Sequence, residues 1–92
     1  MLRVNGKQVL RGSEKIGWVD DQHVYAHNGE KVGYFEGNNI YTHDGKRVGY
    51  IEDHYIKTSD GKSIRLDDNR RHISGGALSD HERAAIRLLL GE

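Results

Sequence analysis

The sequence predicts an all-β domain of four antiparallel β-hairpins around a common axis, followed by one short C-terminal helix. Three observations predict it: a sixteen-residue segment recurs four times, copies carry glycine-centred turns, and a helical capping pattern appears near the C-terminus. We expect residues 1–66 to form the hairpin repeats, and residues 67–92 to form a linker and a helix that packs on them within a single domain.

The repeat is clearest in the middle of the chain. Residues 24–36 (VYAHNGEKVGYFE) align with residues 40–52 (IYTHDGKRVGYIE) at an offset of sixteen. The copy at residues 56–66 keeps the first half of the pattern and loses the second, and residues 14–20 match the second half upstream. The chain therefore contains four copies, of which two are regular.

Each copy is expected to form a β-hairpin. Asn-Gly and Asp-Gly dipeptides accept positive φ at both central positions of a type I′ turn, and short segments rich in Val, Ile, Tyr and Thr flank them. A second polar turn joins each copy to the next, which gives an up-and-down meander. The turn glycines are Gly29, Gly45 and Gly61.

The turn type also predicts the register. A two-residue turn at Asn28-Gly29 places Tyr25 opposite Val32 and Val24 opposite Gly33. Residues that face each other across a strand pair share a face of the sheet. We therefore expect Tyr25 and Val32 on one face and Val24 and Gly33 on the other, with both faces partly apolar.

A second set of glycines lies inside the returning strands, at Gly17, Gly33 and Gly49. Glycine inside a strand weakens it and marks a close backbone approach or a sharp bend. Because three copies carry it at the same place, we expect the hairpins to crowd together there around the common axis.

These motifs resemble a known family. Glycine-centred hairpins whose returning strands carry Lys-Ile-Gly-Trp (15–18), Lys-Val-Gly-Tyr (31–34) and Arg-Val-Gly-Tyr (47–50) are similar to the bacterial four-fold beta-flower domain. The resemblance covers residues 1–66 and implies hairpin petals about a pseudo-four-fold axis. The fourth copy departs from the pattern, with Lys57 and Arg65 in place of Tyr and Gly. The family has no assigned activity, so the resemblance implies a shape and no chemistry.

The tail is expected to hold a polar connector and a helix. Residues 67–72 (DDNRRH) are charged and polar, and residues 74–76 (SGG) form a flexible connection. Ser79 and Glu82 form a capping box that opens a helix, and Gly91 ends it. A helix this short needs a surface to pack on, so we expect it on the open face of the hairpins; the alternative is that it mediates self-association.

Composition limits the function classes. The chain has 92 residues, no Cys, and 14 Lys and Arg against 14 Asp and Glu. Without cysteine there is no disulfide framework or thiol catalysis, and balanced charge argues against nucleic acid and a polybasic membrane anchor. No signal peptide or membrane-spanning run is present, so we expect a cytoplasmic protein. No motif calls for a cofactor.

The candidate binding residues are the repeated aromatic residues. Such rows bind carbohydrates, cations or peptides in other proteins, and they also fill cores. Both interpretations stay open from the sequence, with core packing favoured. The five residues are Trp18, Tyr25, Tyr34, Tyr41 and Tyr50.

The candidate metal ligands are His27 and His43, which occupy equivalent places just before their turns. Polar residues beside tight turns are ordinarily solvated, and two histidines make a poor ligand set, so we expect no metal. His81 begins an HExxH-like stretch, but Ala85 stands where the second histidine of a zinc protease would be.

The sequence therefore favours a structural or protein-interaction module without catalytic activity, with self-association as one form of interaction. The first alternative is small-ligand binding (carbohydrate, cation or peptide) through the repeated aromatics. The second is a metal-dependent hydrolase, which no motif supports.

Overall fold

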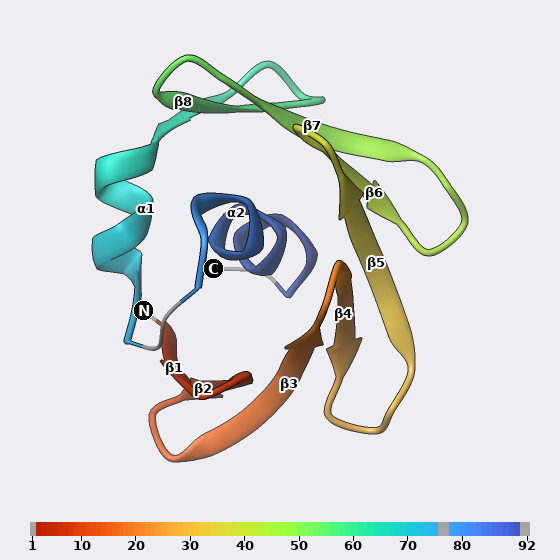
Figure 1. Ribbon diagram of the computed structural model, residues 1–92, viewed down its shortest axis with the longest axis vertical. Coiled ribbons are helices and arrows are strands. Elements are labelled where there is room, and N and C mark those ends of the chain that lie inside the picture. The colour runs from red at the N-terminus through yellow and green to blue at the C-terminus, as the bar shows by residue number, and fades with distance from the viewer. Residues whose placement is uncertain (1, 76–77, 91–92) are drawn as a thin grey trace.

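The computed structural model describes residues 2–75 and 78–90 and shows one β-sheet curved into a ring around a central helix (Figure 1). Within the described residues the sheet has ten strands, and two helices complete the fold. The strands are β1 (Leu2–Asn5), β2 (Gln8–Arg11), β3 (Glu14–Asp20), β4 (His23–Ala26), β5 (Lys31–Glu36), β6 (Asn39–Thr42), β7 (Arg47–Glu52), β8 (Tyr55–Thr58), β9 (Ser63–Arg65) and β10 (Ile73–Ser74). The helices are α1 (Leu66–His72) and α2 (Asp80–Leu89).

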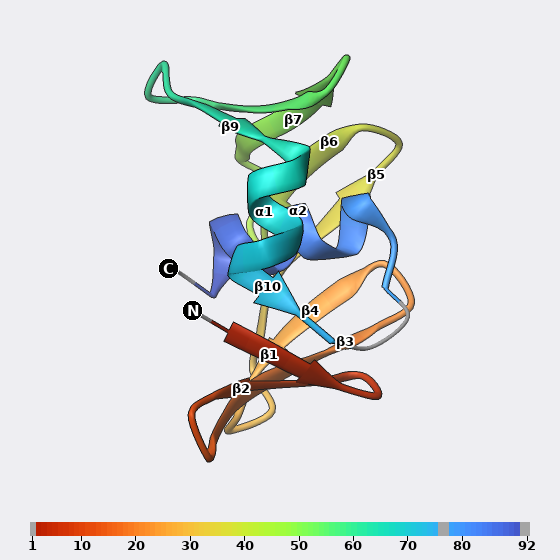
Figure 2. The same cartoon turned by 90° about the vertical axis from the view of Figure 1, so that its left-hand side faces the viewer.

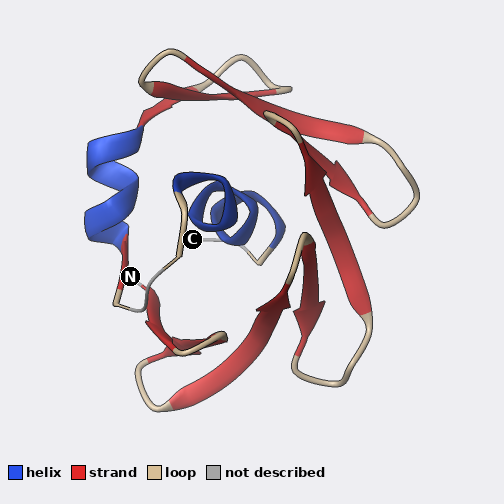
Figure 3. Cartoon of the chain, viewed as in Figure 1, coloured by secondary structure: helices blue, strands red, loops and turns tan. Residues whose placement is uncertain are grey.

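The sheet follows the chain order. Strands β1 to β9 pair antiparallel with their neighbours, and β10 pairs parallel with β1. Four hairpins, β2–β3, β4–β5, β6–β7 and β8–β9, correspond to the four copies of the repeat, and we name them petals 1 to 4. The predicted all-β architecture of antiparallel hairpins with a C-terminal helix is confirmed (Figure 3).

Helix α1 stands where we predicted a polar connector, and that prediction was wrong. It joins β9 to β10 and so bridges the two edges of the sheet, as Figure 2 shows. Acidic residues fill its first turn and basic residues its last, and Asp67 pairs with Arg70 at 2.8 Å on the same helix. Leu66 and Asn69 are buried, so packing holds this short helix in place.

The glycine turns are longer than predicted. In petal 2, the N–H of Gly29 donates to the oxygen of Ala26 at 3.0 Å, and the N–H of Ala26 donates to the oxygen of Glu30 at 2.8 Å. Gly29 has φ +90°, whereas Asn28 keeps a negative φ, which excludes a type I′ turn. The loop has three residues and ends on a left-handed glycine, and petals 3 and 4 repeat its hydrogen bonds.

This extra loop residue changes half of the predicted register. Val24 lies opposite Gly33 as expected, but Tyr25 lies opposite Lys31, because Val32 is the extra residue of a β-bulge. Val32 packs against the core cluster, so placing it on the tyrosine face was wrong. Ile16 and Val48 are skipped in the same way in petals 1 and 3, and bulges of this kind bend a strand.

Leucine side chains at the C-terminal end of α2 pack against the strand glycines. A Cβ on Gly33 would lie 2.6 Å from Leu89 Cδ1 and 2.3 Å from the backbone oxygen of Tyr41. Consecutive helical residues point about 100° apart, close to the quarter turn between petals. Three successive leucines therefore reach three successive petals. The pairs are Leu88 with Gly49, Leu89 with Gly33, and Leu90 with Gly17.

The close approach that glycine permits is thus to the helix and, as we expected, to the neighbouring petal. Each strand glycine lies against a backbone oxygen on the first strand of the next petal, which belongs to Tyr25, Tyr41 and Lys57 in turn. The inner face of the ring and the buried side of α2 form one core, in which Ala84, Ala85 and Ile86 have no exposed surface. The other buried hydrophobic residues are Leu2, Val4, Val9, Val19, Val24, Ile40, Ile51, Ile56, Leu66 and Ile73.

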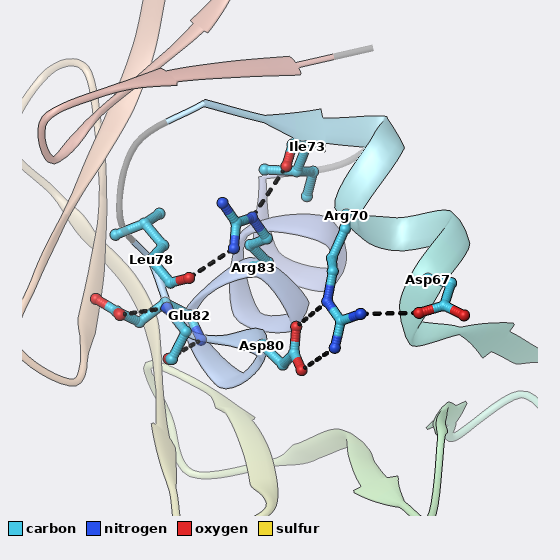
Figure 4. A network of polar contacts seen from close by, with 8 residues as sticks. Asp67, Arg70, Ile73, Leu78, Asp80, Glu82 and Arg83 are labelled. Carbon is cyan, nitrogen blue, oxygen red and sulfur yellow. Dashed lines mark hydrogen bonds and ion pairs between the residues drawn. The ribbon is translucent and has the colours of Figure 1, made fainter.

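The N-terminus of α2 carries the predicted capping box. The N–H of Glu82 donates to Ser79 Oγ at 3.1 Å, and the N–H of Ser79 donates to Glu82 Oε1 at 2.9 Å. Arg83 donates to the backbone oxygens of Ile73 and Leu78 (Figure 4). It also donates to the oxygen of Gly75, and these bonds hold the segment that enters the helix. The expected end of the helix at Gly91 lies outside the described residues, as does Gly76 of the expected flexible connection.

A second contact ties the two helices together. Arg70 on α1 donates from Nε and Nη2 to the two carboxylate oxygens of Asp80 on α2, at 2.9 and 2.7 Å (Figure 4). This bidentate contact lowers the pKa of the Asp80 carboxyl below its ordinary value. The contact joins α2 to the helix that bridges the sheet edges.

Candidate functional site: an outer belt of aromatic rings and cations

The five predicted aromatic residues all lie on the outer face of the ring. Strand alternation turns Val24 and Ile40 toward the helix, so Tyr25 and Tyr41 point away from it. All five are half-buried, neither in the core nor fully exposed. The register pairs Trp18 with Tyr25 and Tyr34 with Tyr41 across neighbouring petals.

These pairs are stacked. The centroids of Trp18 and Tyr25 are 5.4 Å apart with the ring planes 13° apart, and those of Tyr34 and Tyr41 are 5.1 Å apart with an angle of 22°. His23 lies between the pairs, 6.5 Å from Tyr25 and 6.2 Å from Tyr34. Together they form a continuous aromatic row across β3, β4, β5 and β6.

The returning strands of petals 1 to 3 each place a cation over an aromatic ring. Lys15 Nζ lies 4.9 Å from the Trp18 centroid, and Lys31 Nζ lies 5.2 Å from that of Tyr34. Arg47 Cζ lies 4.9 Å from the centroid of Tyr50 in the third petal. None of the three cations pairs with a carboxylate in the described part of the chain.

Sequence reasoning missed these cations, although a basic residue stands three positions before the aromatic residue in each of the first three copies. We name this surface the outer belt. Its ring faces are in part already occupied, by a stacked ring, a cation or both. The groups of the outer belt that can still contact a partner are the ring edges, the tyrosine hydroxyls and the cationic groups. It consists of Lys15, Trp18, His23, Tyr25, Lys31, Tyr34, Tyr41, Arg47 and Tyr50.

Three cavities lie between the petal tips and beside α1, and the first of them is lined in part by Lys31 of the outer belt. A cavity of about 670 Å³ between the tips of petals 2 and 3 includes Val32, His43 and Asp44, and one of about 640 Å³ occupies the equivalent place between petals 3 and 4. A third, of about 420 Å³, lies beside α1. None of these three is lined by Trp18 or by the four tyrosines.

A family model for 4-fold beta flower protein matches residues 8–82, from the start of β2 into the first turn of α2. The chain belongs to this family. The match includes all four petals and α1 and so extends past the residues 1–66 on which the resemblance rested. No curated protein and no solved structure matches the chain.

The histidines considered as metal ligands stand at the tips of two petals of the beta flower. His27 and His43 are exposed, and their backbone N–H groups donate to the oxygens of Ile16 and Val32 at 3.1 Å. Among the described residues, no group of three His, Asp or Glu side chains could hold a metal ion. No helix in that part of the chain is long and apolar enough to cross a bilayer.

Three other titratable groups of the beta flower, Asp44, Asp60 and His81, serve as turn and contact residues. The Thr42 hydroxyl donates to Asp44, and the Thr58 hydroxyl donates to Asp60, and each bond lowers the pKa of its carboxyl. Carboxyls of lowered pKa are poor general acids near neutral pH. His81 contacts Asn38 Oδ1 through Nε2 at 2.7 Å, so it joins α2 to the turn between petals 2 and 3.

Proposed function

We propose that this beta flower is a protein-interaction module without catalytic activity and that its binding surface is the outer belt. The observation that carries the proposal is the three-fold repetition of a basic side chain over a half-exposed aromatic ring. Tyr, Trp and Arg are the residue types enriched where protein interfaces gain most of their affinity. The cations lack carboxylate partners among the described residues, so a carboxylate of a partner can pair with them. Arg47 Nη1 donates to Asn39 Oδ1 at 3.2 Å, which holds its guanidinium on this surface.

The position of α2 supports an interface on the outside. Its buried side, with Ala84, Ala85 and Ile86, is surrounded by the petals (Figure 1). Self-association through this helix would require it to leave the ring. A second copy of the chain can still be the partner, but through the outer belt.

Small-ligand binding has less support. A carbohydrate or a cationic ligand binds to an open aromatic face, usually within a concavity. The rings of Trp18, Tyr34 and Tyr50 already lie under a cation, and none of the three cavities gathers the aromatic residues.

We place the module in the bacterial cytoplasm, where a fold without cysteine needs no oxidising environment.

Photo-crosslinking tests the proposal. A benzophenone-bearing phenylalanine replaces Tyr41 within the outer belt, and in a matched variant it replaces His43, two residues further along the same hairpin. We expect a discrete protein adduct from position 41 that is absent from position 43 and lost when Lys31→Glu is added. An adduct of two copies of the chain identifies self-association. Equal labelling from both positions, or none from position 41, contradicts the proposal.

A further inference from the structure

Petal 4 differs from the other petals in register. In petal 3, Ile40 lies opposite Gly49 and Asn39 opposite Tyr50, with Val48 skipped as a bulge. In petal 4, Ile56 lies opposite Ile64 and Tyr55 lies opposite Arg65, and no residue is skipped. Loss of the bulge moves the returning strand by one residue. By this register, Arg65 takes the outward position that Tyr50 has in petal 3, although it aligns with glycine in the sequence.

Two cations thus take the outward places that Tyr41 and Tyr50 have in petal 3, Arg65 through the shift and Lys57 through the sequence. Lys57 stands where the preceding petal has Tyr41, and its Nζ lies 5.2 Å from the centroid of Tyr55. Tyr55 is the most exposed large hydrophobic residue among those described, at 39%. Neither Lys57 nor Arg65 forms an ion pair with a carboxylate of the described residues. Petal 4 therefore carries two basic groups beside one tyrosine. Arg65 lies opposite Tyr55 on β9, and Lys57 follows two residues later on β8.

A cavity of about 420 Å³ lies at this place, lined by His54, Tyr55, Arg65, Asp67 and Arg70. The acidic group in its wall is already paired, because Arg70 Nη1 donates to Asp67 Oδ1 at 2.8 Å. The other nitrogens of Arg70 bind Asp80. Arg65 is thus the cation in the wall that no carboxylate of the described residues occupies.

We propose that this cavity binds an anionic oxygen group, either a carboxylate or a phosphate. The planar guanidinium of Arg65 donates two parallel N–H bonds to such a group, which a lysine cannot do. The Tyr55 hydroxyl supplies a further donor, and Lys57 adds positive charge nearby. The site is separate from the interface proposed for the outer belt, and neither depends on the other.

Titration of the full chain, labelled with ¹⁵N, tests the site by NMR. Sodium phosphate and sodium acetate are the two probes, and sodium chloride at matched ionic strength is the control. We expect saturable shifts centred on the amides of Tyr55 and Leu66, the second of which donates to His54 oxygen at 2.9 Å. A response to phosphate alone or to acetate alone assigns the class, and a response to both shows a general anion site. Shifts that chloride reproduces overturn the proposal.

Variants locate the binding group. Arg65→Gln should weaken binding of the responding anion by about tenfold or more, because it removes charged hydrogen bonds. Arg71→Gln, on an exposed arginine that pairs with Asp68, should leave binding unchanged. The Arg65 position supplies no side-chain cap to α1, so the variant should keep the folded spectrum. Lys57→Gln should weaken binding by a smaller factor. Unchanged binding in both Arg65→Gln and Lys57→Gln contradicts the assignment.

Discussion

Petals 3 and 4 are copies of the same sixteen-residue unit, but their returning strands face the inside of the ring differently. In petal 3 the returning strand bulges at Val48, and Gly49 leaves room for Leu88. In petal 4 the bulge is absent, and Ile64 fills the place of the glycine. The chain then leaves the sheet and forms α1. Three petals therefore receive leucines from α2, while the fourth leads into the helix that bridges the sheet edges.

The difference between the petals follows from packing one helix inside a ring of four repeats. A helix cannot present identical faces to four petals, but three consecutive leucines point in directions close to those of three petals. Glycine on the petal sets the depth to which each leucine enters. The petal without such a leucine is the one in which Lys57 and Arg65 take the outward places that Tyr41 and Tyr50 have in petal 3.

The largest expected effect comes from filling a glycine site. Gly49→Val should destabilise the fold by about 3 kcal/mol, because a Cβ there would lie 2.6 Å from Leu88 Cδ1 and 2.7 Å from the oxygen of Lys57. Ile64→Val, at the corresponding place in petal 4, should cost about 1 kcal/mol. Denaturant unfolding measures both. Equal midpoints for the two variants would show that the petals do not differ at this position.

The next largest effect should come from the contact of Arg70 on α1 with Asp80 on α2. The folded-state pKa of Asp80 is lowered, so its contribution to stability is full above the unfolded pKa and is lost as pH falls through the folded pKa. Asp80→Asn should cost about 1 kcal/mol at pH 7 and little at pH 2, since the pair is partly exposed. Asp68→Asn, in a more exposed pair, is the control. Unfolding curves at both pH values test this, and a loss independent of pH contradicts it.

A smaller effect should follow from making petal 4 more like petal 3. Lys57→Tyr places an aromatic ring opposite Tyr50, as Tyr41 stands opposite Tyr34. Cross-strand aromatic pairs favour the sheet, so we expect a gain of about 0.5 kcal/mol. Thermal unfolding measures the gain, and a loss of stability would show that the contact of Lys57 with the ring of Tyr55 contributes more to the fold than an aromatic ring opposite Tyr50 would.

The smallest effect should come from a hairpin tip. His43 is exposed, and its backbone N–H donates to the oxygen of Val32 in petal 2. His43→Ala should change stability by less than about 0.5 kcal/mol. Added zinc should not alter the melting temperature of either form. A melting temperature that rises with zinc in the wild type alone would restore the metal-site hypothesis.

Much of the fold could be predicted because local patterns decide it. The sixteen-residue spacing predicted the hairpins, and Ser79 with Glu82 predicted the start of α2. The turn type could not be predicted, since Asn28-Gly29 suits both a two-residue turn and a three-residue loop that ends on glycine. That one residue moved Lys31 into the place of Val32 opposite Tyr25.

Other features depend on contacts distant in sequence. Residues 67–72 form a helix because Leu66 and Asn69 are buried and Arg70 reaches Asp80 ten residues later. The cations of the outer belt recur visibly in the sequence, but only the register shows that they lie over aromatic rings. Whether the rings belonged to the core or to the surface depended on the position of α2, which fills the inside of the ring.

Native-state hydrogen exchange tests most directly whether α2 stays enclosed and binding therefore takes place outside the ring. The amides of Ala85 and Ile86 on α2 are compared with that of Ile40 on β6. We expect equal opening free energies at the three sites, because the helix should leave the ring only when the whole domain unfolds. Faster exchange in α2 while Ile40 stays protected would contradict this, since the helix would then open locally and expose its apolar side to a partner.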